Sequence, residues 1–172
     1  MTVQSGASKF YEPGDIVKET GAIYAGKLPV TKDRPQEMGV FVVLPPDGKL
    51  VCSFNALNDA AERLNKEKIC GDVTLQVPSV ETMLVIIGNR NKGELKKIFD
   101  KYGLNTGKTP EGYLWTDAPG PEGKPQKVGE KKDKTEMPGS FEKLQIRPSD
   151  MDIYHYPKWT GASGMLVYLQ PV

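Results

Sequence analysis

The sequence has few cysteines and almost no histidine. Its 172 residues include two cysteines, Cys52 and Cys70, and one histidine, His155. Two cysteines and a distant histidine do not supply the soft ligands that a structural zinc site needs. A catalytic triad or a Cys–His pair would have to use His155, and neither cysteine lies in a motif typical of a reactive thiol. We therefore expect no catalytic residue, no metal and no cofactor, and a structural or surface role for His155.

The spacing of the two cysteines leaves their pairing open. In an oxidising compartment Cys52 and Cys70 could form a disulfide, and in a reducing one they would be two buried thiols. We expect the second arrangement. No stretch approaches the ~20 apolar residues that span a bilayer, and residues 1–21 do not show the basic and then apolar order of a signal peptide. These observations predict a cytoplasmic protein.

Excess charge of either sign is also missing. The chain has 23 basic and 22 acidic residues and a formal charge of +1. That balance gives no attraction to nucleic acid or to an anionic membrane, and we expect neither as a partner. Glycine and proline, in contrast, are abundant, with 18 and 14 residues. They predict many turns, long loops and few helices.

The length suits one domain preceded by a short arm. We expect a polar N-terminal arm over residues 1–20 and a single domain over residues 21–172. Residues 118–139 combine lysines and prolines with no aromatic residue. They predict a long mobile insertion, which is either a solvated loop or a basic binding loop.

The clearest helix is expected directly after Pro78. Proline lacks an N–H, so an apolar strand can end at Pro78 but not continue through it. Ser79 then follows as a natural helix N-cap, and Glu81 lies in the first turn, where the helix dipole favours negative charge. The apolar stripe is expected to consist of Val80, Met83, Leu84, Ile86 and Ile87. Leu84 is therefore predicted to lie in the core.

The other elements follow from shorter patterns. A first helix is expected after Ser53, and a weaker helical pattern runs through Leu95, Ile98 and Phe99. Residues 39–53 should form a hairpin around a Pro-Pro-Asp-Gly turn. Strands are expected at residues 22–28, 39–44, 49–53, 113–115, 141–147, 151–156 and 164–172. Helices in the first part and mostly antiparallel strands later predict an α+β fold.

The order of these motifs resembles one bacterial family. The motifs are GAIYAGKLP at residues 21–29, DAAERLN at 59–65, VPS at 77–79, NRNKGELKKIF at 89–99 and GYLWTD at 112–117. The family is a domain of unknown function that includes the C-terminal domain of a collagen-like adhesin. The resemblance implies a C-type-lectin-like fold: two main helices, a twisted antiparallel sheet, paired termini and long late loops that contact the ligand.

Several motifs depart from the family pattern. Where the family reads D-W-R-V-P-T, this chain has Leu75 in place of the tryptophan and Gln76 in place of the arginine. The family's W-S-S becomes Trp-Thr-Asp at residues 115–117. After Asp117 the chain aligns with nothing in the pattern until the last strand. The resemblance therefore implies the fold but not a binding site, because late loops carry such sites.

The candidate binding residues lie in an aromatic segment near the C-terminus: Tyr154, His155, Tyr156, Lys158 and Trp159. Aromatic side chains with a polar tip are favoured at interfaces. The alternative is that they cover one end of the sheet. Trp115 is expected in the core instead. The resulting hypothesis is a non-catalytic recognition module that binds a protein or a glycan through its C-terminal loops.

Three further readings stay open from the sequence. Asp150 and Asp152 are two residues apart on one strand face and could form a calcium-ligand pair. A small phage or mobile-element protein that inhibits a host protein would have this size. The fold also resembles that of formylglycine-generating enzymes, but their copper-binding cysteine pair lies late in the chain, whereas Cys52 and Cys70 are early.

Overall fold

The computed structural model describes residues 10–46, 48–120 and 142–172. Within these ranges the fold is mixed α+β, as the sequence predicts. It has three helices and two sheets, whereas two main helices and a single twisted sheet are expected from the resemblance. The helices are α1 (Phe54–Lys66), α2 (Val80–Gly88) and α3 (Gly93–Lys101). The strands are β1 (Ile23–Leu28), β2 (Met38–Val43), β3 (Val51–Cys52), β4 (Leu114–Pro119), β5 (Glu142–Arg147), β6 (Asp152–Pro157), β7 (Ala162–Ser163) and β8 (Leu166–Pro171).

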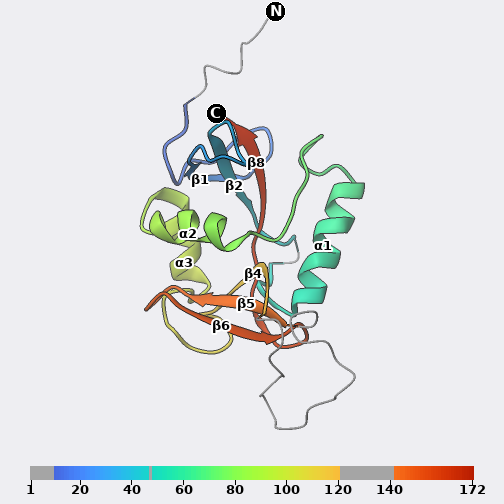
Figure 1. Cartoon of the computed structure of the whole chain (residues 1–172), viewed down its shortest axis with the longest axis vertical. Helices are drawn as coiled ribbons and strands as arrows, with labels where there is room; N and C mark the ends of the chain where they lie inside the picture. The colour runs from blue at the N-terminus through green and yellow to red at the C-terminus, as the bar shows by residue number, and fades with distance from the viewer. Residues whose placement is uncertain (1–9, 47, 121–141) are drawn as a thin grey trace, which may run out of the picture.

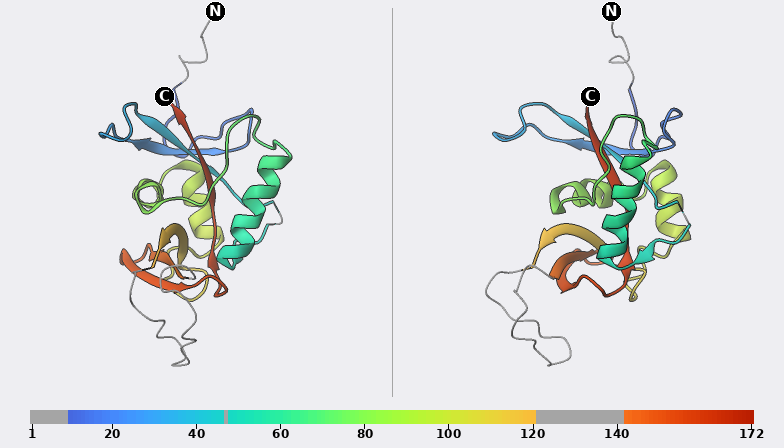
Figure 2. Two further views of the ribbon diagram at one scale, coloured as in Figure 1. Left: turned by 45° about the vertical axis from the view of Figure 1, so that its right-hand side comes forward. Right: turned by 90° about the vertical axis from the view of Figure 1, so that its right-hand side faces the viewer.

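The two sheets lie at opposite ends of the molecule. One has the strand order β1-β2-β8 and the other β3-β7-β4-β5-β6. Helices α2 and α3 lie between them, and α1 runs alongside β8 (Figure 1). The turned views in Figure 2 show the same layers. Residues 162–171 connect the sheets, because β7 belongs to one and β8 to the other.

The first two helices begin where the sequence predicts. The Ser53 hydroxyl accepts a hydrogen bond from the N–H of Ala56 at 3.1 Å, and the Ser79 hydroxyl accepts one from Thr82 at 3.1 Å. Each serine thus satisfies one of the N–H groups that a helix start leaves unpaired. The buried face of α1 consists of Phe54, Leu57, Ala61 and Leu64.

The prediction for Leu84 is wrong. Met83, Ile86 and Ile87 are fully buried in α2, whereas 42% of the Leu84 surface is exposed. Each residue of a helix advances by about 100° around the axis. The buried arc of α2 is centred between Met83 and Ile86, so Leu84 falls beyond its edge. Uniform hydrophobicity along residues 83–87 concealed this asymmetry.

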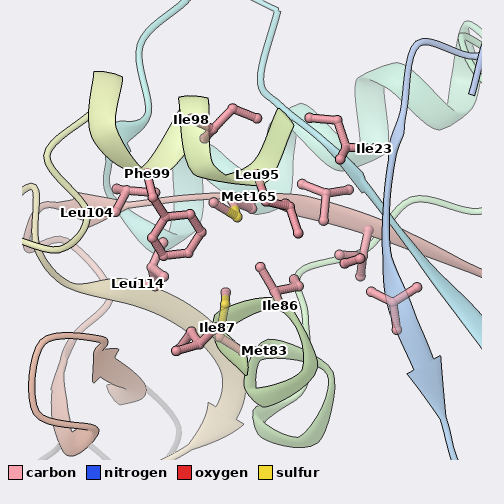
Figure 3. Close-up of a cluster of buried hydrophobic side chains, with 14 of the residues drawn as sticks. Ile23, Met83, Ile86, Ile87, Leu95, Ile98, Phe99, Leu104, Leu114 and Met165 are labelled. Atoms are coloured by element: carbon pink, nitrogen blue, oxygen red, sulfur yellow. The ribbon is translucent and has the colours of Figure 1, made fainter. Parts of the chain in front are cut away.

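The main apolar cluster fills the space between the sheets and around α2 and α3. Figure 3 shows Ile86 and Ile87 facing Phe99 and Leu114, with Met165 nearby. A second cluster contains α1 and the aromatic residues of the three-stranded sheet. In this cluster the rings of Phe41 and Tyr168 stack with a centroid distance of 4.9 Å. Trp115 belongs to it and is fully buried, as predicted.

The pairing of strands corrects three expectations. Residues 39–53 do not form a hairpin, because β3 pairs with β7 while β2 lies between β1 and β8. The first and last strands therefore flank β2 instead of pairing with each other. The apolar run that ends at Pro78 does not form a strand, because residues 74–77 contribute only a single bridge, between Gln76 and Val167. Residues 39–42 of β2 are all buried or nearly so, and a buried strand needs a partner on both edges.

The described part of the predicted arm, residues 10–20, packs on β1 and α3. The N–H of Gly14 donates to the carbonyl of Tyr24 at 2.7 Å, and the N–H of Glu94 donates to the carbonyl of Gly14 at 2.9 Å. Gly14 has a φ of +100°, and a Cβ there would lie 2.5 Å from the Lys92 carbonyl oxygen. Only glycine permits this conformation and this approach.

Neither cysteine forms a disulfide. Cys70 is buried, and burial raises the pKa of its thiol. No helix in the described ranges is long and apolar enough to cross a membrane. Of the predicted insertion at 118–139, residues 118–119 end strand β4, and residues 121–139 lie outside the described chain.

Candidate functional site

Strands β5 and β6 divide the candidate binding residues between two faces. In their antiparallel register, Gln145 pairs with Tyr154 and Lys143 with Tyr156. Side chains alternate along a strand. Tyr154 and Tyr156 therefore share one face with Lys143 and Gln145, while His155 lies on the other.

The remaining candidate residues are not gathered with the two tyrosines. The His155 Nδ1 lies 3.0 Å from Oε1 of Glu142, a carboxyl group that is only 1% exposed. The carbonyl of Lys158 accepts a hydrogen bond from the N–H of Phe54 at 2.8 Å, where α1 begins. Trp159 is 63% exposed in the turn after β6. The predicted cluster is thus reduced to Tyr154 and Tyr156 as neighbours on one face.

Arg147 organises the tyrosine face. Its guanidinium carbon lies 5.1 Å from the ring centroid of Tyr154 and 5.5 Å from that of Tyr113. Its Nη1 donates to the Tyr113 hydroxyl at 2.9 Å, and its Nε donates to Oδ1 of Asp150 at 2.9 Å. Its Nη2 donates to Asp150 and, at 3.4 Å, to Asp152. The two carboxylates of the proposed calcium pair therefore both hydrogen-bond to the guanidinium of Arg147.

These contacts shift the pKa of Asp150. The hydrogen bond from Arg147 holds the pKa of Asp150 below its ordinary value, and the same bond raises the pKa of Arg147. A carboxyl group whose pKa is lower in the folded state stabilises the fold at pH values above its unfolded pKa, about 4. That contribution decreases as the pH falls through the folded pKa.

The first prediction follows from this shift. Asp150→Asn should lower the melting temperature at neutral pH, because it removes the charged acceptor of Arg147. As the pH falls through the lowered pKa of the folded state, the wild-type carboxyl also becomes protonated, so the difference between the two proteins should shrink. Thermal melts of both proteins from neutral to strongly acidic pH measure this. A difference that stays constant across the whole range would contradict the assignment of the shift to this ion pair.

A cavity of about 330 Å³ lies next to the tyrosine face. Its lining comes from the segment before β4, from β5 and β6, and from the turn after β6. The lining residues are Thr109, Pro110, Tyr113, Gln145, Tyr156, Thr160 and Gly161. The rings of Tyr113 and Tyr156 stand nearly perpendicular, at 85°, with centroids 6.3 Å apart. The cavity is therefore mostly apolar, with a few polar groups in its walls.

Gln145 is the unusual residue in this cavity. Its side chain is 2% exposed. Its Nε2 is the single buried side-chain nitrogen or oxygen in the described chain that has no hydrogen-bond partner. Leaving a buried donor unpaired costs about 1–3 kcal/mol, and native proteins seldom do so without a functional reason. This nitrogen has almost no accessible surface, so it does not offer its N–H groups to a ligand in the cavity.

Sequence reasoning identified one lining residue, Tyr156, and missed the others. Along β5 the polar residues Lys143, Gln145 and Arg147 alternate with apolar ones, a pattern that indicates a solvent-facing side. Gln145 is buried between its cross-strand neighbours Trp115 and Tyr154, and residues of two distant segments, 109–113 and 160–161, line the cavity beside it. No local signal in the sequence places those two distant segments beside β5.

A larger hollow, of about 550 Å³, lies at the other end of the molecule. Tyr11, Phe41, Cys70, Tyr168 and Val172 contribute to its walls. Its principal buried polar group is already paired, since the Tyr168 hydroxyl lies 3.1 Å from the hydroxyl of Thr20. This hollow therefore lacks the unpaired group that distinguishes the Gln145 cavity.

The described residues contain no group of three or more histidine, cysteine or acidic side chains arranged to hold a metal ion. No protein-family model matches the chain. No curated protein matches it either.

Proposed function

We propose that this protein is a non-catalytic recognition module with a C-type-lectin-like fold, which acts in the cytoplasm. Its binding site is the Gln145 cavity, formed in the C-terminal half by β5, β6 and the turn after β6. The observation that carries this proposal is the cavity beside the nearly perpendicular rings of Tyr113 and Tyr156, with the polar residues Gln145 and Thr160 in its lining. Such a mostly apolar cavity with a few placed polar groups is the usual form of a ligand site.

Recognition is favoured over catalysis by what surrounds the cavity. A hydrolytic or transfer mechanism needs a nucleophile beside a base. The only histidine, His155, lies on the opposite face of β6 and pairs with Glu142. An oxidative mechanism of the formylglycine-generating kind would need a close cysteine pair, and neither cysteine lines the cavity. What the cavity offers is hydroxyl groups and ring faces.

The lectin-like part of the proposal is supported by the arrangement of the elements. Three helices precede the late strands, and the five-stranded sheet is mostly antiparallel. Residues 102–113 connect α3 to β4 without forming a further helix or strand. In such folds the late connections meet the ligand, which agrees with a cavity lined by residues of segments 109–113 and 160–161.

The second prediction tests the location of the site. Tyr156→Ala should weaken binding at least tenfold, because it removes one aromatic wall of the cavity. Trp159→Ala is the matched control, since Trp159 is aromatic, nearby and exposed but does not line the cavity. Binding is measured against two panels, one of immobilised glycans and one of immobilised peptides. Circular dichroism confirms that both variants remain folded.

The panel result has clear consequences. Loss of binding in Tyr156→Ala with binding retained in Trp159→Ala supports the cavity. The reverse pattern would place the site on the exposed turn and overturn the location. If the wild-type protein binds no member of either panel, the recognition function itself is wrong.

A further inference from the structure

We propose that the Gln145 cavity binds a proline-rich peptide in the polyproline II conformation, with one basic residue beside the proline run. This inference rests on the recognition function proposed above and names the class of partner for the same site. The aromatic walls of the cavity, its uncharged lining and an excess of carboxylates next to it all favour such a partner.

Aromatic rings form the walls of the proposed site. The ring centroids of Tyr113 and Tyr156, which both line the cavity, are 6.3 Å apart. The ring of Tyr154 continues this surface, with its centroid 5.5 Å from that of Tyr113 and 6.2 Å from that of Tyr156. Grooves lined by aromatic side chains are the usual docking sites of proline-rich segments. The apolar ring of a proline side chain therefore fits these walls.

The lining of the cavity carries no charge. None of the described residues that line it is acidic or basic. Most peptide residues would bring a backbone N–H into this mostly apolar space, where an unpaired donor is unfavourable. Proline has no N–H. A sugar would bring several hydroxyl groups, each of which both donates and accepts hydrogen bonds. A proline run therefore asks the least of this lining.

Negative charge exceeds positive charge where β6 begins. The guanidinium of Arg147 donates to the carboxylates of both Asp150 and Asp152, so one positive charge faces two negative ones. The Asp152 side chain is 60% exposed, and its Oδ2 also accepts a hydrogen bond from the Tyr154 hydroxyl at 3.2 Å. An exposed carboxylate thus lies at the end of the tyrosine surface. It is the expected partner of a lysine or arginine in the peptide.

The length of β6 sets the spacing within the peptide. The four residue steps from Tyr156 to Asp152 span about 13 Å of strand. A polyproline II helix rises about 3.1 Å per residue. In a peptide that runs along β6, the basic residue is therefore expected about four residues from the proline that fills the cavity. The polyproline II conformation is largely present before binding, so little conformational entropy is lost.

The third prediction tests this partner class with defined peptides. The probes are acetylated and amidated hexaprolines with one arginine at the N-terminal or the C-terminal end. The matched controls replace every second proline by alanine or the arginine by glutamate. Isothermal titration calorimetry on the full chain should show binding of at least one arginine peptide. Its alanine control should bind at least tenfold more weakly. Its glutamate control should also bind more weakly, by a factor that decreases with added salt.

Two substitutions locate the two parts of the peptide. Tyr156→Ala should weaken binding of the arginine peptide at least tenfold, because it removes an aromatic wall. Asp152→Asn should weaken it by about threefold, the scale of one exposed ion pair, and should reduce the preference over the glutamate peptide. Asp100→Asn is the matched control. Asp100 is also an exposed acidic residue in an ion pair, with Lys96 on α3, but it does not line the cavity.

The outcomes separate this inference from the proposed function. Equal binding of the proline and alanine peptides, or binding confined to the glycan panel, would overturn the proline-rich partner while recognition stands. Equal binding of the arginine and glutamate peptides, or equal losses in Asp152→Asn and Asp100→Asn, would overturn the basic residue. Unchanged binding in Tyr156→Ala would place the peptide outside the cavity. Failure of all peptides and of both panels would overturn the recognition function as well.

Discussion

Trp115→Ala is expected to lower the free energy of unfolding by roughly 3–5 kcal/mol, the range for truncating a fully buried aromatic residue. Trp115 is completely enclosed, and its ring meets that of Phe54 at a centroid distance of 5.8 Å. Its indole N–H donates to the Cys52 carbonyl at 2.8 Å. The substitution thus creates a cavity and also removes the donor for a strand carbonyl. Urea denaturation monitored by circular dichroism measures the change.

The second tryptophan of the chain supplies the control. Trp159 is 63% exposed, and a surface substitution of this kind changes stability by about 0.5 kcal/mol or less. Trp159→Ala should therefore unfold at nearly the urea concentration of the wild type. Equal losses at the two positions would mean that the turn after β6 contributes to the core and that the described burial is wrong.

Ile86→Ala should cost roughly 2–5 kcal/mol of stability, and Leu84→Ala should cost far less. The two residues belong to the same helix, but Ile86 is fully buried between the sheets, whereas Leu84 is 42% exposed. The removed groups are similar in size, so the comparison isolates burial from helix propensity. Thermal and urea unfolding of both variants provide the measurement.

If Leu84→Ala cost more stability than Ile86→Ala, α2 would have to be rotated about its axis relative to the described structure. Leu84 would then belong to the buried apolar stripe, as the sequence pattern predicts. A similar loss at both positions would mean that α2 is enclosed on all sides.

Most local elements could be predicted from the sequence because their signals are local. Ser53 and Ser79 mark helix starts through their own hydroxyl groups, and the β-branched run of β2 indicates a strand without knowledge of its partners. The predicted strands at residues 141–147 and 151–156 correspond to β5 and β6. In each case the deciding chemistry lies within one or two turns of the chain.

Pairing and covering could not be predicted in the same way. The turn after β2 resembles a hairpin turn, yet β3 pairs with β7, far along the chain. Gln145 has the alternation of a solvent-facing residue, yet it is buried between its cross-strand neighbours Trp115 and Tyr154. Which distant segment covers a strand depends on how the large apolar surfaces of the chain pack against one another. A short sequence pattern does not contain this information.

The position of β2 between β1 and β8 has a consequence for biosynthesis. A ribosome releases β1 and β2 early, whereas β8, the second neighbour of β2, is made near the end of the described chain. Until residues 166–171 emerge, one edge of a strand rich in valine and phenylalanine has no partner, and such an edge is a template for association between nascent chains. This sheet can therefore be completed only after residues 166–171 have been synthesised. Until then, the unfinished chain stays soluble only if encounters between nascent chains are slow or if chaperones cover the unpaired edge of β2.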